Sequence, residues 1–179
     1  MYLPREDSFF LSETLNQFFK HRDVKSKKFL DIGSGTGIQA ETLEKFTGRM
    51  NIVCADIDKE SLLLLKSKGF NAVESDLFSN IQGEFDFIIF NPPYLPAHPL
   101  DKQKDTTGGK LGDETILRFL KEAEKHLSKN GKIFLLISSL TPEKRIYSYL
   151  KSKYKFLSLI HISEPTRLLS ISYAVFCLK

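Results

Sequence analysis

The chain has 179 residues, of which 41% are hydrophobic and 27% are charged. This composition excludes disordered, collagen-like and coiled-coil proteins, and the length predicts one domain over residues 1–179. The formal net charge of +4 is a mild excess spread along the chain, so a dedicated nucleic-acid binder is less well supported. The opening residues carry two acids, unlike a signal peptide, and the longest apolar run, Ile133–Ile137, is too short to cross a bilayer. We therefore expect a cytoplasmic protein with no membrane contact.

Short β-rich runs alternate with helical patterns along the chain. Strands are predicted over residues 28–32, 51–55, 71–74, 85–90, 132–138, 155–160 and 169–178. Helices are predicted over residues 8–20, 38–46, 113–129 and 141–151, with Asn130-Gly131 as the stop of the third and Thr141-Pro142 as the start of the fourth. Such alternation favours an α/β fold of parallel βαβ units. Because only eight residues separate the last two strands, we expect a seven-stranded, mostly parallel sheet with an antiparallel C-terminal hairpin strand.

A glycine-rich turn, Gly33-Ser34-Gly35-Thr36-Gly37, follows the first predicted strand. Glycines allow a sharp turn and the close approach of a ligand, and the N-terminus of the next helix offers unpaired N–H groups. The stretch from Gly35 to Ala40 also fits the G-x-G-x-x-A form of the dinucleotide fingerprint. The turn therefore predicts a nucleotide-like ligand without separating NAD from S-adenosylmethionine.

Three aspartates at the ends of the first three strands distinguish NAD from S-adenosylmethionine better than the glycine turn does. In an open α/β sheet such strand ends face one crevice. Asp31 could meet a ligand ammonium group, Asp56 the ribose hydroxyls and Asp76 the exocyclic amine of an adenine. A pyrophosphate would be repelled by Asp31, whereas S-adenosylmethionine uses all three carboxylates. The alternative is that each aspartate merely ends a strand or caps a helix.

The fourth strand runs into Asn91-Pro92-Pro93-Tyr94. The two prolines fix φ and remove N–H donors, so the turn is rigid and presents bare carbonyls. A planar NH₂ group is a poor nucleophile, but the Asn91 side-chain oxygen and the Pro92 carbonyl could hold its two hydrogens while Tyr94 stacks on its plane. The lone pair of the nitrogen would then face the methyl group on the sulfonium of S-adenosylmethionine. A plain strand-ending turn is the alternative interpretation.

Together these motifs resemble a class I S-adenosylmethionine-dependent methyltransferase that acts on planar nitrogens. Residues Tyr2–Leu11 (YLPREDSFFL) resemble the opening of the HemK-like release-factor glutamine methyltransferases, in their short archaeal and eukaryotic branch. Gly108–Gly112 resembles that branch's Gly-Gly-x-x-Gly segment. The resemblance covers nearly the whole chain and is weakest after about Tyr147, and residues 161–168 match nothing in it.

The resemblance implies a Rossmann-like fold, S-adenosyl-L-methionine as cofactor with S-adenosyl-L-homocysteine as product, and methylation of the glutamine in the Gly-Gly-Gln motif of a peptide-chain release factor. Asn91, Pro92, Pro93 and Tyr94 would bind the target amide, with Asn91, Pro92 and Tyr94 catalytic. The cofactor would be held by Ser8, Asp31, Gly33, Gly35, Asp56, Asp76, Leu77 and Asn91.

The resemblance also implies a partner. The short branch works with a small zinc-binding activator subunit that pairs along the sheet edge, for which Asn71–Glu74 is the candidate strand here. Since Met1 directly precedes the opening motif, we expect the chain to lack the extra helical domain of the bacterial branch. We expect no metal site in the chain itself, and its two cysteines, Cys54 and Cys177, fit reduced core thiols.

Three other functions stay open. An adenine or cytosine amino-group methyltransferase acting on RNA or DNA could use the same turn, although no target-recognition insertion is visible. A non-catalytic module that binds S-adenosylmethionine is the second, and the intact Asn91–Tyr94 turn speaks against it. An NAD oxidoreductase is a remote third.

Overall fold

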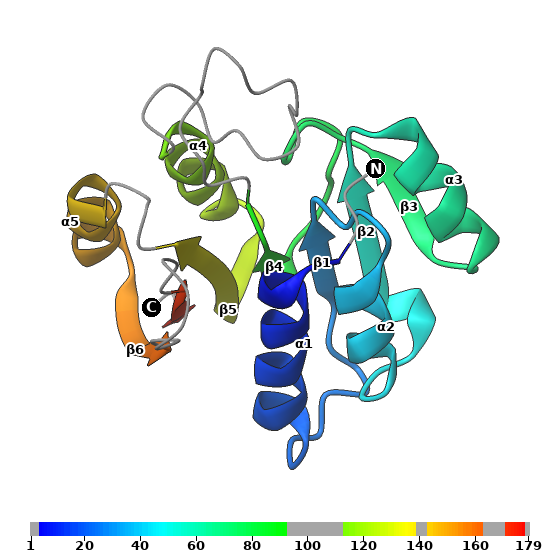
Figure 1. The fold of residues 1–179 in the computed structure, drawn as a ribbon, viewed down its shortest axis with the longest axis horizontal. Coiled ribbons are helices and arrows are strands. Elements are labelled where there is room, and N and C mark those ends of the chain that lie inside the picture. Colours follow the sequence, from blue (N-terminus) through cyan, green and yellow to red (C-terminus); the bar gives the residue numbers. More distant parts are fainter. Residues whose placement is uncertain (1–3, 93–112, 139–142, 163–170, 178–179) are drawn as a thin grey trace.

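A computed structural model describes residues 4–92, 113–138, 143–162 and 171–177. Its strands form one seven-stranded sheet in the order β3-β2-β1-β4-β5-β7-β6, which Figure 1 shows with α3 beside β3 and α5 beside β6 at the two ends. The strands are β1 (Phe29–Ile32), β2 (Ile52–Asp56), β3 (Asn71–Glu74), β4 (Phe85–Phe90), β5 (Leu127–Ser138), β6 (Lys155–Ile162) and β7 (Ile171–Cys177).

The five strands β3, β2, β1, β4 and β5 are parallel to one another. This confirms the predicted α/β architecture with a parallel sheet. The last strand, β7, lies between β5 and β6 and is antiparallel to both. The predicted strands 71–74 and 85–90 coincide with β3 and β4.

Helices cover both faces of the sheet. Successive strand side chains point to opposite faces and so belong to two separate apolar clusters. The helices are α1 (Glu6–Phe19), α2 (Ile38–Glu44), α3 (Lys59–Ser67), α4 (Glu114–Ala123) and α5 (Glu143–Lys153), with a 3₁₀ turn at Arg49–Asn51. In β1, Phe29 packs with α1, α2 and α3, whereas Leu30 packs with α4 and α5 on the other face. A strand covered on both faces is apolar at successive positions, as predicted.

The helix predicted over residues 113–129 was wrong in its second half. α4 ends at Ala123, and Leu127 is already the first residue of β5. It pairs with Phe85, and the register shifts before Lys132 pairs with Phe87. Asn130-Gly131 therefore lies inside β5 and does not stop a helix. A Cβ atom on Gly131 would lie 2.7 Å from the Leu127 side chain and 3.0 Å from the Phe85 carbonyl oxygen, so the close packing at this position favours glycine.

Several predicted features lie outside the described residues. These are Pro93 and Tyr94, the segment 108–112, Thr141-Pro142 as the start of α5, and the turn before β7. Within the described parts of the chain, no helix is long and apolar enough to span a membrane. The same parts contain no cluster of three or more His, Cys, Asp or Glu side chains suited to a metal ion.

The N-terminus of α3 is capped by a side chain that is expected to stabilise the protein. Asp58 caps this helix, its Oδ2 accepting from the backbone N (2.9 Å) and Oγ (2.7 Å) of Ser61. These hydrogen bonds lower the pKa of the Asp58 carboxyl. Asp58→Ala is expected to lower the free energy of unfolding by about 1 kcal/mol at neutral pH, measured by urea denaturation.

The effect of Asp58→Ala should depend on pH with a defined sign. A lowered pKa in the folded protein adds stability above the unfolded pKa, and this stability is lost as pH falls through the folded pKa. The difference between the two proteins should therefore shrink in acid. Asp23→Ala, at an exposed position outside the helices, is the control and should change stability by less than about 0.5 kcal/mol. Equal losses in both variants would contradict the capping role.

Candidate active site

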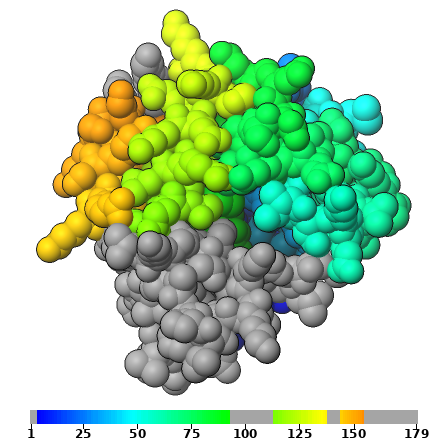
Figure 2. All heavy atoms as spheres, turned by 90° about the horizontal axis from the view of Figure 1, so that it is seen from above, coloured from blue at the N-terminus to red at the C-terminus, as the bar shows by residue number. Residues whose placement is uncertain are grey.

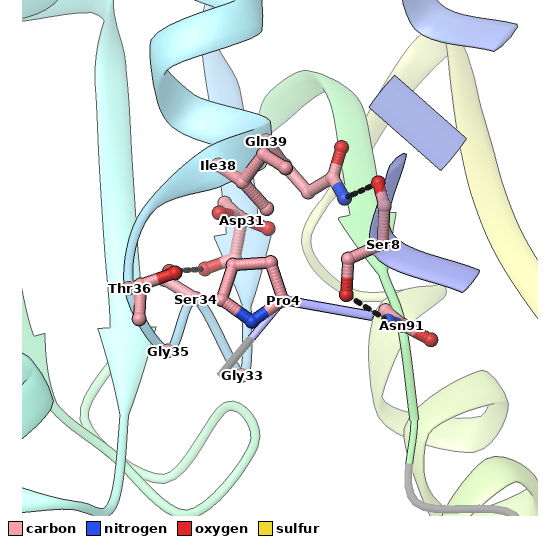
Figure 3. A pocket seen from close by; sticks show the side chains of 10 residues that line it. All are labelled: Pro4, Ser8, Asp31, Gly33, Ser34, Gly35, Thr36, Ile38, Gln39 and Asn91. Atoms are coloured by element: carbon pink, nitrogen blue, oxygen red, sulfur yellow. Dashed lines mark hydrogen bonds between the residues drawn. The ribbon is translucent and has the colours of Figure 1, made fainter. Parts of the chain in front are cut away.

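The candidate site lies where the strand order reverses, between β1 and β4. Ile32 and Phe90, the last residues of these parallel neighbours, are in register, so Gly33 and Asn91 leave the sheet side by side. Ligands of open α/β sheets bind at such a switch point, outside the carboxyl ends of the strands. The structure has a pocket there, shown in Figure 3 and lined by Pro4, Ser8, Asp31, Gly33, Ser34, Gly35, Thr36, Ile38, Gln39 and Asn91.

The glycine turn forms one wall of the pocket. Gly33 and Gly37 have φ values of 62° and 89°, in the left-handed region that favours glycine. A Cβ atom on Gly37 would also lie 2.7 Å from a methyl carbon of Leu65 in α3. The turn thus needs glycine at Gly37 both for its backbone conformation and for the packing of α2 against α3.

Asp31 lies at the base of the pocket and is 1% exposed. Its Oδ2 has no hydrogen-bond partner among the described residues. Burial raises the pKa of this carboxyl from an ordinary 3.8 to about 8, a hydrogen bond from Ser34 opposes the rise, and the charge of Asp56 adds to it. A buried carboxyl oxygen without a partner is costly, and a ligand ammonium group would supply the partner that Oδ2 lacks.

The other two predicted aspartates are not among the residues that line the pocket. Asp56 supports the turn, because its Oδ2 accepts from the backbone N of Gly35 (2.7 Å) and its Oδ1 from that of Asp58 (2.9 Å). Asp76 is 63% exposed and forms an ion pair with Arg118 of α4. Residues of α4 and of the segment after β3 adjoin on the surface seen from above in Figure 2. Their contacts with a cofactor stay predictions.

Leu77 and Pro92 are also placed by the structure. Leu77 follows Asp76, is buried, and has a φ of 50°, which is unusual for a residue with a side chain. Pro92 is buried directly after Asn91. Neither residue lines the pocket, and their predicted contacts with cofactor and target are not tested by the geometry.

Asn91 faces the pocket from the end of β4, opposite the glycine turn (Figure 3). Its Nδ2 donates to Oδ2 of Asp7 (3.0 Å) and to Oγ of Ser8 (3.4 Å), both in the first turn of α1. Its Oδ1 is buried and has no hydrogen-bond partner among the described residues. The side chain is therefore anchored through its nitrogen, and its oxygen is left as an acceptor.

Two residues of this site escaped the sequence interpretation. Asp7 anchors Asn91, and Gln39 of α2 donates from Nε2 to the Ser8 carbonyl oxygen (2.9 Å). Asp7 lies in the Glu-Asp-Ser stretch of the opening motif. The motif therefore marked this position, but nothing in the sequence indicated that Asp7 contacts Asn91. Gln39 occupied a position of the dinucleotide fingerprint that may be any residue, and no local pattern marked it.

Comparisons with known proteins agree with this geometry. The family model "MTS: Methyltransferase small domain" matches residues 8–164. A protein of Methanocaldococcus jannaschii, provisionally named a protein N5-glutamine methyltransferase, is 39% identical over 163 residues, which cover 84% of this chain and 79% of that protein. The release factor glutamine methyltransferase of Lactococcus lactis is 28% identical over 152 residues, covering 75% of this chain and 55% of the relative.

Two further relatives differ in what they act on. Ribosomal RNA small subunit methyltransferase C of Serratia proteamaculans is 31% identical over 121 residues, covering 64% of this chain and 32% of the relative. The crystal structure of a ribosomal protein L11 methylase from Lactobacillus delbrueckii has a TM-score of 0.70 at 15% identity, covering 98% of this chain and 81% of that chain. The chain thus spans less than two thirds of the Lactococcus and Serratia relatives, and the structural likeness concerns the fold.

Proposed function

Because the chain belongs to the methyltransferase small domain family, we propose that it methylates the side-chain amide nitrogen of a protein glutamine, using S-adenosyl-L-methionine. Its fold is the Rossmann-like α/β fold of class I methyltransferases. The observation that carries the proposal is Asn91, a residue that lines the pocket and whose buried Oδ1 is an acceptor without a partner among the described residues.

The residues of the pocket fit the cofactor. The buried Asp31 carboxyl suits the methionyl ammonium group, and the turn from Gly33 to Gly35 allows a close approach of the ribose. Ser8 lines the pocket from α1. We propose that Asp56, Asp76 and Leu77 complete the cofactor site beyond the pocket. When bound, S-adenosyl-L-methionine supplies a sulfonium-activated methyl group and leaves as S-adenosyl-L-homocysteine.

The chain's own contribution to transfer would be alignment. Oδ1 of Asn91 and the Pro92 carbonyl would accept the two hydrogens of the target amide, with Pro93 and Tyr94 completing the site. Drawing the hydrogens out of the amide plane would return lone-pair density to the nitrogen, so that it could accept a methyl group. The methylated nitrogen would then lose one proton. Alignment of this kind can supply roughly 7 to 11 kcal/mol of the barrier.

The proposed substrate is a peptide-chain release factor, methylated at the glutamine of its Gly-Gly-Gln motif. Support comes from the Lactococcus relative, whose name states this class of substrate. Release factors act at ribosomes, so we propose a cytoplasmic enzyme in which residues 1–179 form the catalytic domain.

Methyl transfer from labelled S-adenosyl-L-methionine to a purified release factor tests this proposal. We expect label in the wild-type factor and background counts in a factor whose Gly-Gly-Gln glutamine is replaced by alanine. The assay should be run with and without a small zinc-binding activator subunit. Equal labelling of both factors would contradict the assignment of the acceptor.

We propose that the activator subunit would pair with β3. This strand lies at one edge of the sheet, and an edge strand offers unpaired backbone groups for pairing with another chain. Isolation of the chain as a fully active monomer from cells that lack such a subunit would contradict this part of the proposal.

A second candidate is methylation of a base amino group in RNA. The observation that favours it is the 31% identity to a ribosomal RNA methyltransferase. A base amino group is a planar nitrogen that the Asn91–Tyr94 turn could hold in the same way as an amide. Binding to RNA would then weaken steeply with salt, since phosphate contacts release counterions. A shallow salt slope together with transfer to the release factor would leave glutamine as the acceptor.

A further inference from the structure

We propose that Asp7 is a positioning residue that sets the direction of the Asn91 side-chain amide. The inference rests on the proposed function, because it concerns the same reacting nitrogen. Asp7 Oδ2 lies 3.0 Å from Asn91 Nδ2, although the two residues are 84 positions apart in the chain. Asp7 is 4% exposed and is not among the residues that line the pocket, whereas Asn91 is. It therefore acts through Asn91.

The carboxylate of Asp7 discriminates between the two ends of the Asn91 amide. A carboxylate only accepts hydrogen bonds, so it binds the NH₂ end and repels the oxygen. Ser8 Oγ, 3.4 Å from the same nitrogen, adds a second acceptor. With the nitrogen held, Oδ1 is turned to the opposite side, where it is buried without a partner among the described residues. A flipped amide would place a donor there and could not hold the hydrogens of a target NH₂ group.

The local fold supports a carboxylate at this position. Asp7 lies in the first turn of α1, after the N-cap Arg5, where backbone N–H groups have no acceptor within the helix and the helix dipole favours negative charge. This first turn is also held from outside α1. Gln39 Nε2 of α2 donates to the Ser8 carbonyl oxygen (2.9 Å).

These contacts form a continuous chain between the two halves of the site. α2, which begins directly after the glycine turn, holds the first turn of α1 through Gln39, and that turn holds Asn91 through Asp7. The cofactor wall and the acceptor for the target amide are thereby fixed relative to one another. Such supporting contacts keep a reacting constellation within a fraction of an ångström of its productive geometry.

The test compares Asp7→Ala and Asp7→Asn with the wild-type enzyme, using kcat for methyl transfer and Kd for S-adenosyl-L-methionine. We expect Asp7→Ala to lower kcat by about 10- to 100-fold, as for other residues that orient a functional side chain, with Kd nearly unchanged. Asp7→Asn keeps the size and an acceptor oxygen and should retain intermediate activity. Ser12→Ala removes a polar contact of the same helix away from Asn91 and should leave kcat unchanged.

A second readout does not depend on turnover. The ¹⁵N resonance of the Asn91 side-chain amide, assigned by its loss in Asn91→Ala, should shift and exchange faster with water in Asp7→Ala and stay in place in Ser12→Ala. Failure of the wild-type enzyme to methylate glutamine would contradict the proposed function. The resonance of the Asn91 amide would still test the role of Asp7, because it does not depend on turnover. An unchanged resonance, an unchanged kcat, or a weaker Kd with unchanged kcat would overturn the inference.

Discussion

Replacing Asn91 with alanine is expected to lower kcat for methyl transfer by about 100- to 1000-fold, the range for losing one preorganised group that stabilises a transition state. Asn91 lines the pocket, and its Oδ1 is a buried acceptor without a partner among the described residues. Without it, one hydrogen of the target amide has no partner, and the nitrogen keeps its planar, weakly nucleophilic form. The measurement is the single-turnover rate with saturating cofactor and release factor.

Cofactor binding should be largely kept in Asn91→Ala, because the ammonium and ribose contacts are assigned to other residues of the pocket. Isothermal titration with S-adenosyl-L-methionine measures this directly. Asn16→Ala removes the same amide group from α1, where it lies outside the pocket, and is the control for the chemistry of the substitution. A variant of Asn91 that transfers methyl groups at the wild-type rate would remove the residue from the mechanism we propose.

Asp31→Asn is expected to weaken S-adenosyl-L-methionine binding by about 10- to 150-fold near pH 7.5, corresponding to roughly 1.5 to 3 kcal/mol for a hydrogen bond to a charged group. Asp31 is buried at the base of the pocket, and burial raises its pKa to about 8. Binding of a cation favours the ionised carboxylate, so the wild-type affinity should rise with pH toward that value. In Asp31→Asn this rise should be absent.

The comparison of affinities belongs below about pH 7.5, because an α-amino group begins to lose its own proton near pH 8. Glu41→Gln, at an exposed position of α2, is the control for removing one carboxylate from the protein. Parallel pH profiles of wild type and Asp31→Asn would show that another group governs the binding of the cofactor.

The raised pKa of Asp31 also predicts how the stability of the cofactor-free protein depends on pH. The folded pKa of Asp31 is raised from 3.8 to about 8, so the folded state binds more protons than the unfolded state between these values. The stability from this group is thus fully present below about pH 4 and is lost as pH rises toward 8. Denaturation of Asp31→Asn should show a smaller decline of stability over this window. An identical decline in both proteins would contradict the raised pKa.

Local patterns predicted most of the sheet. β3 and β4 have the predicted bounds. In β4 this is because a largely apolar run from Phe85 to Phe90 is limited by polar residues on both sides. The end of α4 was missed because Leu127 continues the helical spacing of its apolar residues. Its position is decided by pairing with Phe85, a contact 42 residues away along the chain that outweighs local preference.

The sequence by itself determined the chemistry that is available to this protein: a glycine turn after one apolar strand, a carboxylate beside it, and Asn91 after another strand. These are properties of short segments, which is why spacing and residue type reveal them. The tertiary structure alone decided that β1 lies beside β4, that Asp31 is buried while Asp76 is exposed and paired with Arg118, and that Asp7 reaches Asn91. Strand order and burial depend on contacts between distant segments, and periodicity within a segment carries no record of its neighbours in space.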